Sequence, residues 1–485
     1  MNATDDNYPY RYERTAHIGE LRERHDELEP GAETTEPVHV AGRMMSVRGQ
    51  GKAAFADLRD ASGRIQLFAR QNVLGDEGME SFKSLGVGDI VGVIGEVIKT
   101  RRGELSINVR SATLLAPCLR PMPDQWHGMT HVETRYRQRY LDLLLNPSAR
   151  GVVEARARAN SAVRGFLEGR GFIEVETPLL QPIASGAVAR PFVTHHNALD
   201  IDLYLRVAPE LYLKRLLVGG LERVYELNRS FRNEGVSTQH NPEFVMLEAY
   251  EAYADYEDTM ALVEELVRAI AEAVNGSVTA EIDEHNSIDL GKPFARTTIF
   301  EAIEQHGGVD LEAVWRAEDW TGLGRGVDAL GVHVDPAWSP GKVVLEAYEA
   351  VAERKIVEPT FVVGFPRDVS PLAKDHRSLP GFTEHSDLTI KGMEIAPIYS
   401  ELNDPAEQRR RFEQQAAQRS HGDEEAMVAD EDFLEALGYG MPPAGGFGLG
   451  MERLVMILLN LPSLREVILF PTLKPDGGRD PGPPI

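Results

Sequence analysis

The sequence predicts an α+β protein in which a small β-barrel precedes a larger domain of helices and strands. Three observations support this prediction. The chain has 485 residues, 42% of them hydrophobic, which is enough for two or three domains with sizeable cores. Short strand-like runs separated by turn residues fill residues 38–116. Helical and strand-like segments then alternate over residues 135–474.

The barrel is predicted from five strand-like runs with Gly and Asp between them, and from a helix at 72–87 between the third and fourth runs. Five strands and one helix in about 80 residues are typical of the OB-fold. We expect an N-terminal extension over 1–36, the OB-fold domain over 37–117 and a proline-containing linker over 118–134. The strand-like runs cover residues 38–47, 53–60, 64–71, 89–100 and 104–116.

The larger domain, expected over 135–474, contains two amphipathic helices. Apolar residues recur at helical spacing over 155–170 and again over 255–274. Residues 277–350 are predicted to form an inserted helical subdomain with its tryptophans in the core. The last residues, 475–485, are rich in Gly, Pro and Asp and cannot bury apolar surface, so they are expected to be disordered.

Composition narrows the functional classes. The formal net charge of −25 argues against non-specific DNA binding, because such binding depends on neutralising phosphates. The single cysteine, Cys118, excludes an internal disulfide and a cysteine-cluster metal site. No apolar run is long enough to cross a membrane, and the first residues lack the pattern of a secretory signal. We therefore expect a cytoplasmic protein that binds neither DNA nor membranes.

Three separated segments indicate a nucleotide-handling site. The first, 171–180, has a proline where a helix meets a strand. The second, 231–244, is an arginine-bearing strand, a polar loop and a return strand with an aromatic residue. The third, 445–454, is a glycine-rich strand that runs into a helix starting near Arg453. Alone, the second segment would be a surface hairpin with solvated charges, but the three in this order resemble motifs 1, 2 and 3 of the class II aminoacyl-tRNA synthetases.

The second and third segments supply side chains that suit a nucleotide. Arg232 stands at the end of its strand, where a guanidinium can bind a phosphate in a bidentate manner. Phe244 offers a flat face to a base, and Arg453 can cover the other face or reach a terminal phosphate. Catalysis by such a site rests on positioning and electrostatics, and it needs no protein nucleophile.

The resemblance implies an enzyme that activates an amino acid with ATP, on a mostly antiparallel sheet flanked by helices. It implies that Arg232 and Arg453 are catalytic, at the α-phosphate and the γ-phosphate respectively. Asp387 and Glu394 match the family's magnesium-binding acids, and Mg²⁺ prefers such oxygen ligands. A homodimer formed through motif 1 is also implied. The implied ATP-binding residues are Arg232, Glu234, His240, Phe244, Glu394 and Arg453.

Acidic side chains in the predicted pocket strands favour a cationic amino acid. A pocket for a buried ammonium must supply carboxylates and hydroxyls, because an unpaired buried charge is very costly. Taken singly, each acid would be a structural ion pair. The surrounding segments closely resemble the bacterial-type lysyl-tRNA synthetases, over nearly the whole chain from about Tyr8 to Lys474. The implied lysine-binding residues are Gly186, Glu210, Glu248, Tyr250, Tyr399 and Glu401. In this set, Glu401 and Tyr250 would bind the ε-ammonium and Glu210 the α-amino group.

The predicted barrel supports a role in tRNA binding, because OB-folds bind single-stranded nucleic acid through stacked aromatics and a basic groove. Arg43, Phe55 and Gln66 fall on its first three strands, and similar positions in this family read the central anticodon uridine. The alternative for Phe55 is a place in the barrel core. The expected partners are ATP, L-lysine or a close analogue, tRNA(Lys) and a second copy of the chain.

Four departures from the family keep alternatives open. Pro397, Ile398 and Tyr399 replace the usual Asn-Gly-Phe, and a proline offers neither an N–H nor a side-chain amide. Asp387 replaces a glutamate, Gln239 stands where many members carry arginine, and the helix before the barrel is largely missing. One alternative is a paralogue that activates a lysine analogue or charges a different acceptor. The other is a catalytically silent regulator that binds tRNA.

Overall fold

The computed structural model describes residues 8–123, 129–183, 186–187, 189–283, 285–420 and 427–475. Contacts divide the chain into two compact units, residues 1–130 and residues 131–485. The tail predicted to be disordered, 475–485, lies outside the described residues except for Pro475. Among the helices of the described ranges, none is both long and apolar enough to cross a membrane.

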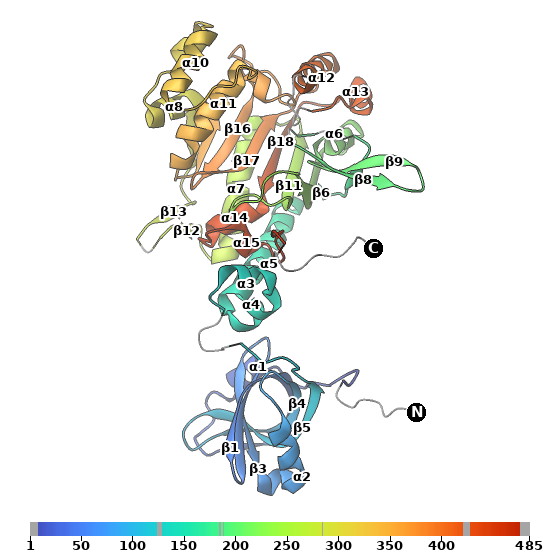
Figure 1. The fold of residues 1–485 in the computed structure, drawn as a ribbon, viewed down its shortest axis with the longest axis vertical. Coiled ribbons are helices and arrows are strands. Elements are labelled where there is room, and N and C mark those ends of the chain that lie inside the picture. The colour runs from blue at the N-terminus through green and yellow to red at the C-terminus, as the bar shows by residue number, and fades with distance from the viewer. Residues whose placement is uncertain are drawn as a thin grey trace. The chain divides into compact units, whose positions relative to one another are not determined.

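The first unit is a closed barrel with strand order β1-β2-β3-β5-β4, which confirms the predicted OB-fold (Figure 1). Inward-facing residues alternate along the strands, so Ala56, Leu58, Ile65 and Leu67 are buried in the barrel core. A helix, α2, connects β3 to β4 as predicted, and a short helix, α1, precedes β1. The bounds are α1 Ile18–His25, β1 Glu33–Gln50, β2 Ala53–Arg59, β3 Arg64–Arg70, α2 Gln71–Ser84, β4 Ile90–Lys99 and β5 Leu105–Ala116.

The second unit is built on an eight-stranded sheet with the order β14-β15-β16-β17-β18-β11-β10-β6. Neighbouring strands run antiparallel except for β14 with β15 and β6 with β10. The prediction of a mostly antiparallel sheet is therefore confirmed. The bounds are β6 Ile173–Glu174, β10 Arg223–Phe231, β11 Glu243–Ala252, β14 Ala295–Thr298, β15 Thr360–Val363, β16 His385–Ile390, β17 Met393–Ser400 and β18 Ala444–Gly450.

Two long helices cover this sheet. Helices α5 (Pro147–Glu168) and α7 (Tyr256–Asn275) pack against each other, and α7 also contacts β17 and β18 (Figure 1). Met260, Val263 and Val267 are fully buried in the main core, because their spacing places them on one face of α7. Both helices were predicted. The first begins earlier than its apolar pattern indicated, at a proline that the first helical turn tolerates.

The segment 277–350 contains strands as well as helices, which differs from the helical insertion that was predicted. It carries the hairpin β12–β13 and then β14, whose β-branched residues Thr297 and Thr298 pair with β15. Its helices enclose a core of their own, where Trp315 packs against Phe300 and Phe382. The bounds are β12 Thr279–Glu281, β13 Ser287–Asp289, α8 Ile299–Gly307, α9 Glu312–Arg316, α10 Trp320–Ala329 and α11 Pro340–Val351.

Pro178 lies in the connection between β6 and β7, not within a strand, because a proline cannot donate to a ladder. Strand β7 joins a small antiparallel sheet of order β7-β9-β8.

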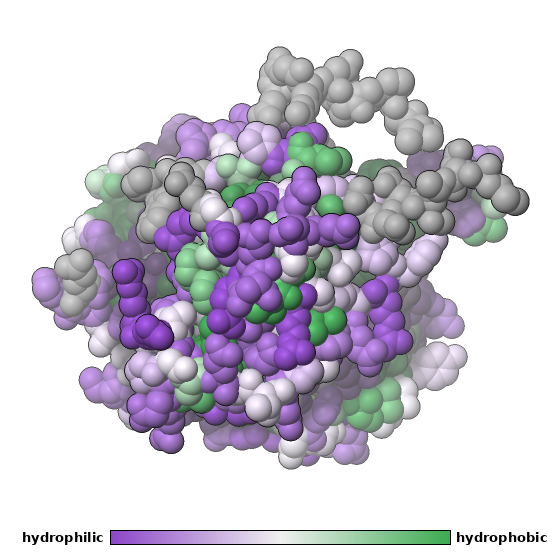
Figure 2. Space-filling model, turned by 90° about the horizontal axis from the view of Figure 1, so that it is seen from below, coloured by the Kyte–Doolittle hydropathy of each residue, from purple (hydrophilic) through white to green (hydrophobic). Residues whose placement is uncertain are grey.

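The surface that Figure 2 shows is mainly hydrophilic, with its apolar side chains in small separate patches. The remaining bounds are α3 Val132–Arg137, α4 Arg139–Leu145, β7 Leu180–Gln181, β8 Phe192–His196, β9 Ile201–Leu205, α6 Glu210–Val218, α12 Pro405–Ser420, α13 Glu431–Gly438, α14 Met451–Leu458 and α15 Leu464–Val467.

Candidate active site

The hairpin of β10 and β11 forms one side of the site. Its register sets Ser230 opposite Phe244, and Arg232 follows at the end of β10, where its backbone N–H donates to the Pro242 carbonyl at 2.9 Å. The Arg232 guanidinium lies 5.3 Å from the centre of the Phe244 ring, as a cation over an aromatic face. The pairing of the two strands thus brings together the side chains predicted for phosphate and base.

Strand β18 lies against β11, and its glycines leave room for neighbouring side chains. A β-carbon on Gly446 would collide with the Glu401 carboxylate and with the Tyr250 ring. Close packing therefore requires glycine at this position. Helix α14 begins directly after the strand, at Met451, which places Arg453 in its first turn.

One cavity of about 800 Å³ is lined by all six predicted ATP-binding residues. The Arg453 guanidinium donates to the backbone carbonyl of Glu394 at 2.8 Å and lies 3.5 Å from Nε2 of His240. Burial and the nearby Arg453 lower the pKa of His240, so its ring is neutral at neutral pH. The structure therefore gathers Arg232, Glu234, His240, Phe244, Glu394 and Arg453 around one space.

A second cavity of about 1070 Å³ adjoins the first. Gly186, Glu210, Glu248, Tyr250 and Tyr399 line the second cavity, as predicted for the substrate pocket, and Glu401 does not. Both cavities are lined by Arg232, Met246, Glu394 and Pro397. A phosphate in the first cavity and a carboxylate in the second could therefore meet at the Arg232 guanidinium.

The Glu401 carboxylate is buried beside Lys214 instead of facing the open cavity. Nζ of Lys214 lies 2.5 Å from Oε2 of Glu401 and 2.6 Å from Oε1 of Glu210. Lys214 is itself fully buried, one helical turn after Glu210 on α6. The sequence analysis missed Lys214, although an acid and a base spaced i, i+4 on a helix were the available signal.

The acids of the second cavity have an electrostatic environment that favours a bound cation. The Tyr250 hydroxyl donates to Glu248 at 3.0 Å, and both side chains are buried. Burial and, next, the Glu210 carboxylate raise the pKa of Glu248 to about 8. Burial likewise raises the pKa of Glu401 to about 7, against the opposing effect of Lys214. Such acids hold protons in an empty pocket and ionise beside an ammonium group.

Asp387 and Glu394, the acids predicted to bind magnesium, both line the second cavity. Burial and, next, the Asp387 carboxylate raise the pKa of Glu394, against the opposing effect of Arg453 and Arg232. Carboxylate oxygens fit Mg²⁺ well. Within the described part of the chain there is no group of three acidic, histidine or cysteine ligands. An ion at this pair would therefore take its other ligands from phosphate oxygens and water.

Asp387 is held by a histidine that the sequence analysis missed. Nε2 of His385 lies 2.8 Å from Oδ1 of Asp387, and its Nδ1 lies 2.8 Å from Oγ of Ser370. The imidazole packs between Phe365 and Tyr399, with ring centres 4.1 Å and 4.5 Å away. The i, i+2 spacing of His385 and Asp387, which places both on one face of β16, was the available signal.

On the barrel, Phe55 stacks on Phe68 with ring centres 4.6 Å apart and planes only 5° apart. Neither ring belongs to the barrel core, so the core alternative for Phe55 is wrong. Gln66 accepts a hydrogen bond from Ser106 at 3.0 Å, and Arg43 donates to a backbone carbonyl at 2.6 Å. The sequence analysis missed Phe68, which the β2–β3 register places directly opposite Phe55.

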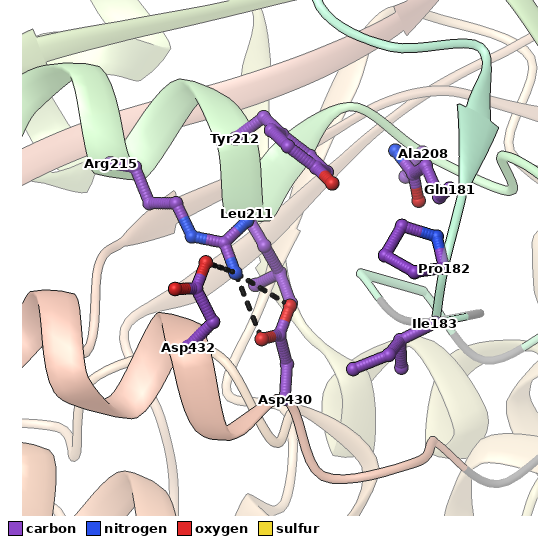
Figure 3. A pocket seen from close by; sticks show the side chains of 9 residues that line it. All are labelled: Gln181, Pro182, Ile183, Ala208, Leu211, Tyr212, Arg215, Asp430 and Asp432. Carbon is purple, nitrogen blue, oxygen red and sulfur yellow. Dashed lines mark hydrogen bonds and ion pairs between the residues drawn. The ribbon is translucent and has the colours of Figure 1, made fainter.

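A second face of helix α6, which carries Tyr212 and Arg215, lines a third cavity of about 480 Å³ (Figure 3). There, Nη2 of Arg215 lies 2.8 Å from both carboxylate oxygens of Asp430 and 3.0 Å from Asp432. Asp430 caps α13 and Asp432 lies in its first turn. This ion pair links α6 to α13. Glu210 and Lys214 lie on the other side of α6, toward the amino-acid cavity.

The fold and the two adjoining cavities define a class of enzyme. Residues 131–474 match the family model of class II tRNA synthetases (D, K and N), and residues 38–115 match that of the OB-fold nucleic acid binding domain. The chain belongs to the class II tRNA synthetases.

Lysine–tRNA ligases of several organisms are similar to this chain over nearly its whole length. That of Moorella thermoacetica is 53% identical, over 96% of this chain and 93% of its own. That of Pelotomaculum thermopropionicum is 51% identical over 96% and 91%, and that of Gloeobacter violaceus 49% over 97% and 95%.

Proposed function

We propose that this chain is an ATP-dependent lysine–tRNA ligase. The observation that carries the proposal is the pair of adjoining cavities, one lined by arginines and an aromatic ring and the other by several acids. The identity of about half of all residues with lysine–tRNA ligases, over nearly the whole chain, supports the same activity. Since tRNA charging serves translation, we expect the enzyme to work in the cytoplasm.

The reaction would have two steps. The carboxylate of lysine attacks the α-phosphorus of ATP, which forms lysyl-adenylate and releases pyrophosphate. The terminal ribose hydroxyl of tRNA then attacks the activated carbonyl, which forms lysyl-tRNA and releases AMP. Arg232 stands where the two cavities meet, so it would stabilise the charge that develops on the α-phosphate. Phe244 and Glu234 would hold the adenine, and Arg453 would bind the γ-phosphate.

The second cavity would hold lysine by its charged groups. Glu210 would accept a hydrogen bond from the α-ammonium group, and Tyr250 and Glu248 would accept from the ε-ammonium group. Glu401 does not line the cavity, so it would reach the ε-ammonium group through its Oε1, which lies beside the Tyr250 ring. The substrate carboxylate would face Arg232. Tyr399 and Gly186 line the same cavity and would shape its wall.

Asp387 and Glu394 would hold Mg²⁺ together with phosphate oxygens. The bound ion supplies charge neutralisation for the phosphates during activation. Oxygen donors on both residues and the raised pKa of Glu394 fit this role. His385 would fix the orientation of the Asp387 carboxylate through its 2.8 Å contact.

Amino-acid-dependent exchange between ATP and pyrophosphate tests the proposal directly. We expect strong exchange with lysine and little with other standard amino acids. The panel should include ornithine and β-lysine, because Pro397 lines both cavities where the family carries asparagine. Preference for an analogue would identify a specialised paralogue. Silence across the panel together with tRNA binding would identify a non-catalytic regulator.

We also propose a homodimer that forms through the first motif. Apolar side chains around it are unusually exposed in the single chain, with Ile173 50%, Leu180 45%, Val193 60% and Ile201 42% exposed. Burial of this surface against a second copy would remove it from water. Light scattering coupled to size exclusion should give twice the chain mass of 53.7 kDa, and Ile173→Glu should shift the mass toward the monomer.

The barrel would bind the anticodon of tRNA(Lys). The stacked Phe55 and Phe68 pair offers an aromatic surface for unpaired bases, and Gln66 and Arg43 lie on the neighbouring strands. A comparison of charging rates for tRNA(Lys) and for a transcript with a substituted central anticodon base tests this role.

A further inference from the structure

Lys214 is a buried cation that the reaction described above does not use. Its side chain has no exposed surface. Its Nζ lies 2.6 Å from Glu210 and 2.5 Å from Glu401, and it also donates to the backbone carbonyl of Leu372 at 3.4 Å. An isolated buried ammonium is strongly unfavourable, and the two carboxylates compensate it. Lys214 therefore joins an acid of α6 to the acid that directly follows β17.

The charges around the amino-acid cavity match a diamino acid. Glu210 and Glu248 line this cavity, and Lys214 pairs with Glu210 and with Glu401 beside it. Lysine brings two ammonium groups that would pair with these acids, while its own carboxylate would face Arg232. An amino acid with an uncharged side chain would leave the acids near that side chain without a cation.

Glu401 retains one oxygen for a ligand. Its Oε2 forms the ion pair with Lys214, and neither of its buried oxygens has a partner with hydrogen-bond geometry among the described residues, so Oε1 has neither kind of contact. This Oε1 lies close to Gly446 and beside the Tyr250 ring. A buried acceptor without a donor is costly, so an ammonium group from the substrate would relieve this cost.

We propose that Lys214 is a positioning residue for lysine specificity, because its ammonium group lies between the carboxyl groups of Glu210 and Glu401 and holds both in place. This inference rests on the proposed lysine activity. Among the described groups that influence Glu401 or are influenced by it, Lys214 is the one cation. These groups are Lys214 and Glu210 from α6, Tyr250 from β11, and Tyr399 from β17.

Removal of Lys214 has a consequence that depends on pH. Burial already raises the pKa of Glu401 to about 7, and the charge of Lys214 opposes that effect. Without this charge the pKa rises further, so the side chain is a neutral acid at pH 7. Lysine would then have to displace a proton before it gains the carboxylate. The loss of affinity is therefore largest at low pH and becomes smaller as the pH rises.

The test compares lysine binding by wild type and Lys214→Met from pH 6 to pH 9, by calorimetry on the full chain. At pH 7 we expect an affinity loss of about tenfold or more, with partial recovery toward pH 9. In exchange assays the KM for ATP should change by less than about threefold. An equal loss at every pH, or no loss, would overturn the inference. A wild-type protein without lysine-dependent exchange would instead overturn the proposed function.

Arg215→Met is the matched control, because it removes a cation from the next residue of the same helix. Arg215 pairs with Asp430 and Asp432, away from the amino-acid cavity (Figure 3). We expect a lower thermal midpoint but the wild-type pH profile of lysine binding. A profile shifted as in Lys214→Met would show that the effect is structural and would reject the positioning role.

Two further variants keep the inference testable. In Lys214→Met combined with Glu401→Gln, the pH-dependent part of the loss should disappear, because the acid whose ionisation Lys214 favours is absent. If Lys214→Met does not fold, Lys214→Arg retains the charge. It should keep the wild-type pH profile even if its affinity changes, and a shifted profile in Lys214→Arg would refute the proposal.

Discussion

The two adjoining cavities differ in how the chain builds them. The nucleotide cavity takes most of its polar lining from one hairpin and from the first turn of α14, and these residues stand within two short segments of the sequence. The amino-acid cavity collects acids from α6, β11 and β17, which are far apart along the chain. Phosphate and base are recognised by arginines that are always charged, whereas the ammonium groups need acids whose charge depends on their surroundings.

The largest effect is expected from Arg232→Ala, since Arg232 is shared by both cavities. Loss of a preorganised cation at the reacting phosphate should lower the rate of ATP–pyrophosphate exchange by about 10²–10³-fold. The value of kcat/KM should fall for lysine and for ATP alike. A defect confined to one substrate would show that Arg232 acts in only one of the two cavities.

Glu401→Gln should affect the use of lysine far more than the use of ATP. The variant removes a buried carboxylate next to Lys214, so the KM for lysine should rise by about 10²-fold. The KM for ATP should stay within a few fold, because Glu401 does not line the nucleotide cavity. Equal losses for both substrates, measured in the same exchange assay, would contradict the assigned role.

Phe55→Ala addresses the barrel, which neither cavity includes. A lost base–aromatic stack is worth about 1–3 kcal/mol, so tRNA charging should slow by about tenfold or more. Lysyl-adenylate formation should be unchanged. If exchange without tRNA fell by the same factor, the barrel would not be a separate recognition module.

The smallest effect is the pH dependence of lysine binding by the wild type. The raised pKa of Glu248, about 8, means that it is mostly protonated in the empty pocket at pH 7. An ammonium group favours the carboxylate, so binding should release protons, and affinity should increase several-fold from pH 6 to about pH 8. Calorimetry in buffers of different ionisation enthalpy measures this release. Binding without proton release would mean that Glu248 is already ionised in the empty pocket.

The sequence could predict the nucleotide cavity because most of its lining residues lie close together along the chain. Arg232 and Phe244 come together through hairpin pairing of near neighbours, and Arg453 follows from a glycine-rich strand that ends in a helix. The barrel was predictable for the same reason, since the alternation within each short strand marks its buried face. Strand β14 was missed because it is short and pairs with a partner some 60 residues later along the chain, β15.

The amino acids alone determined the class of fold, the order of most of its elements and the residue types of the nucleotide cavity. Only the tertiary structure decided that Lys214 lies between Glu210 and Glu401, that His385 holds Asp387, and that the Phe55 ring stacks on Phe68. The physical reason is that a charge or a ring acquires its role from what surrounds it. Burial and the distances between residues remote in sequence set the protonation and orientation of these groups. A short sequence pattern predicts neither burial nor such distances.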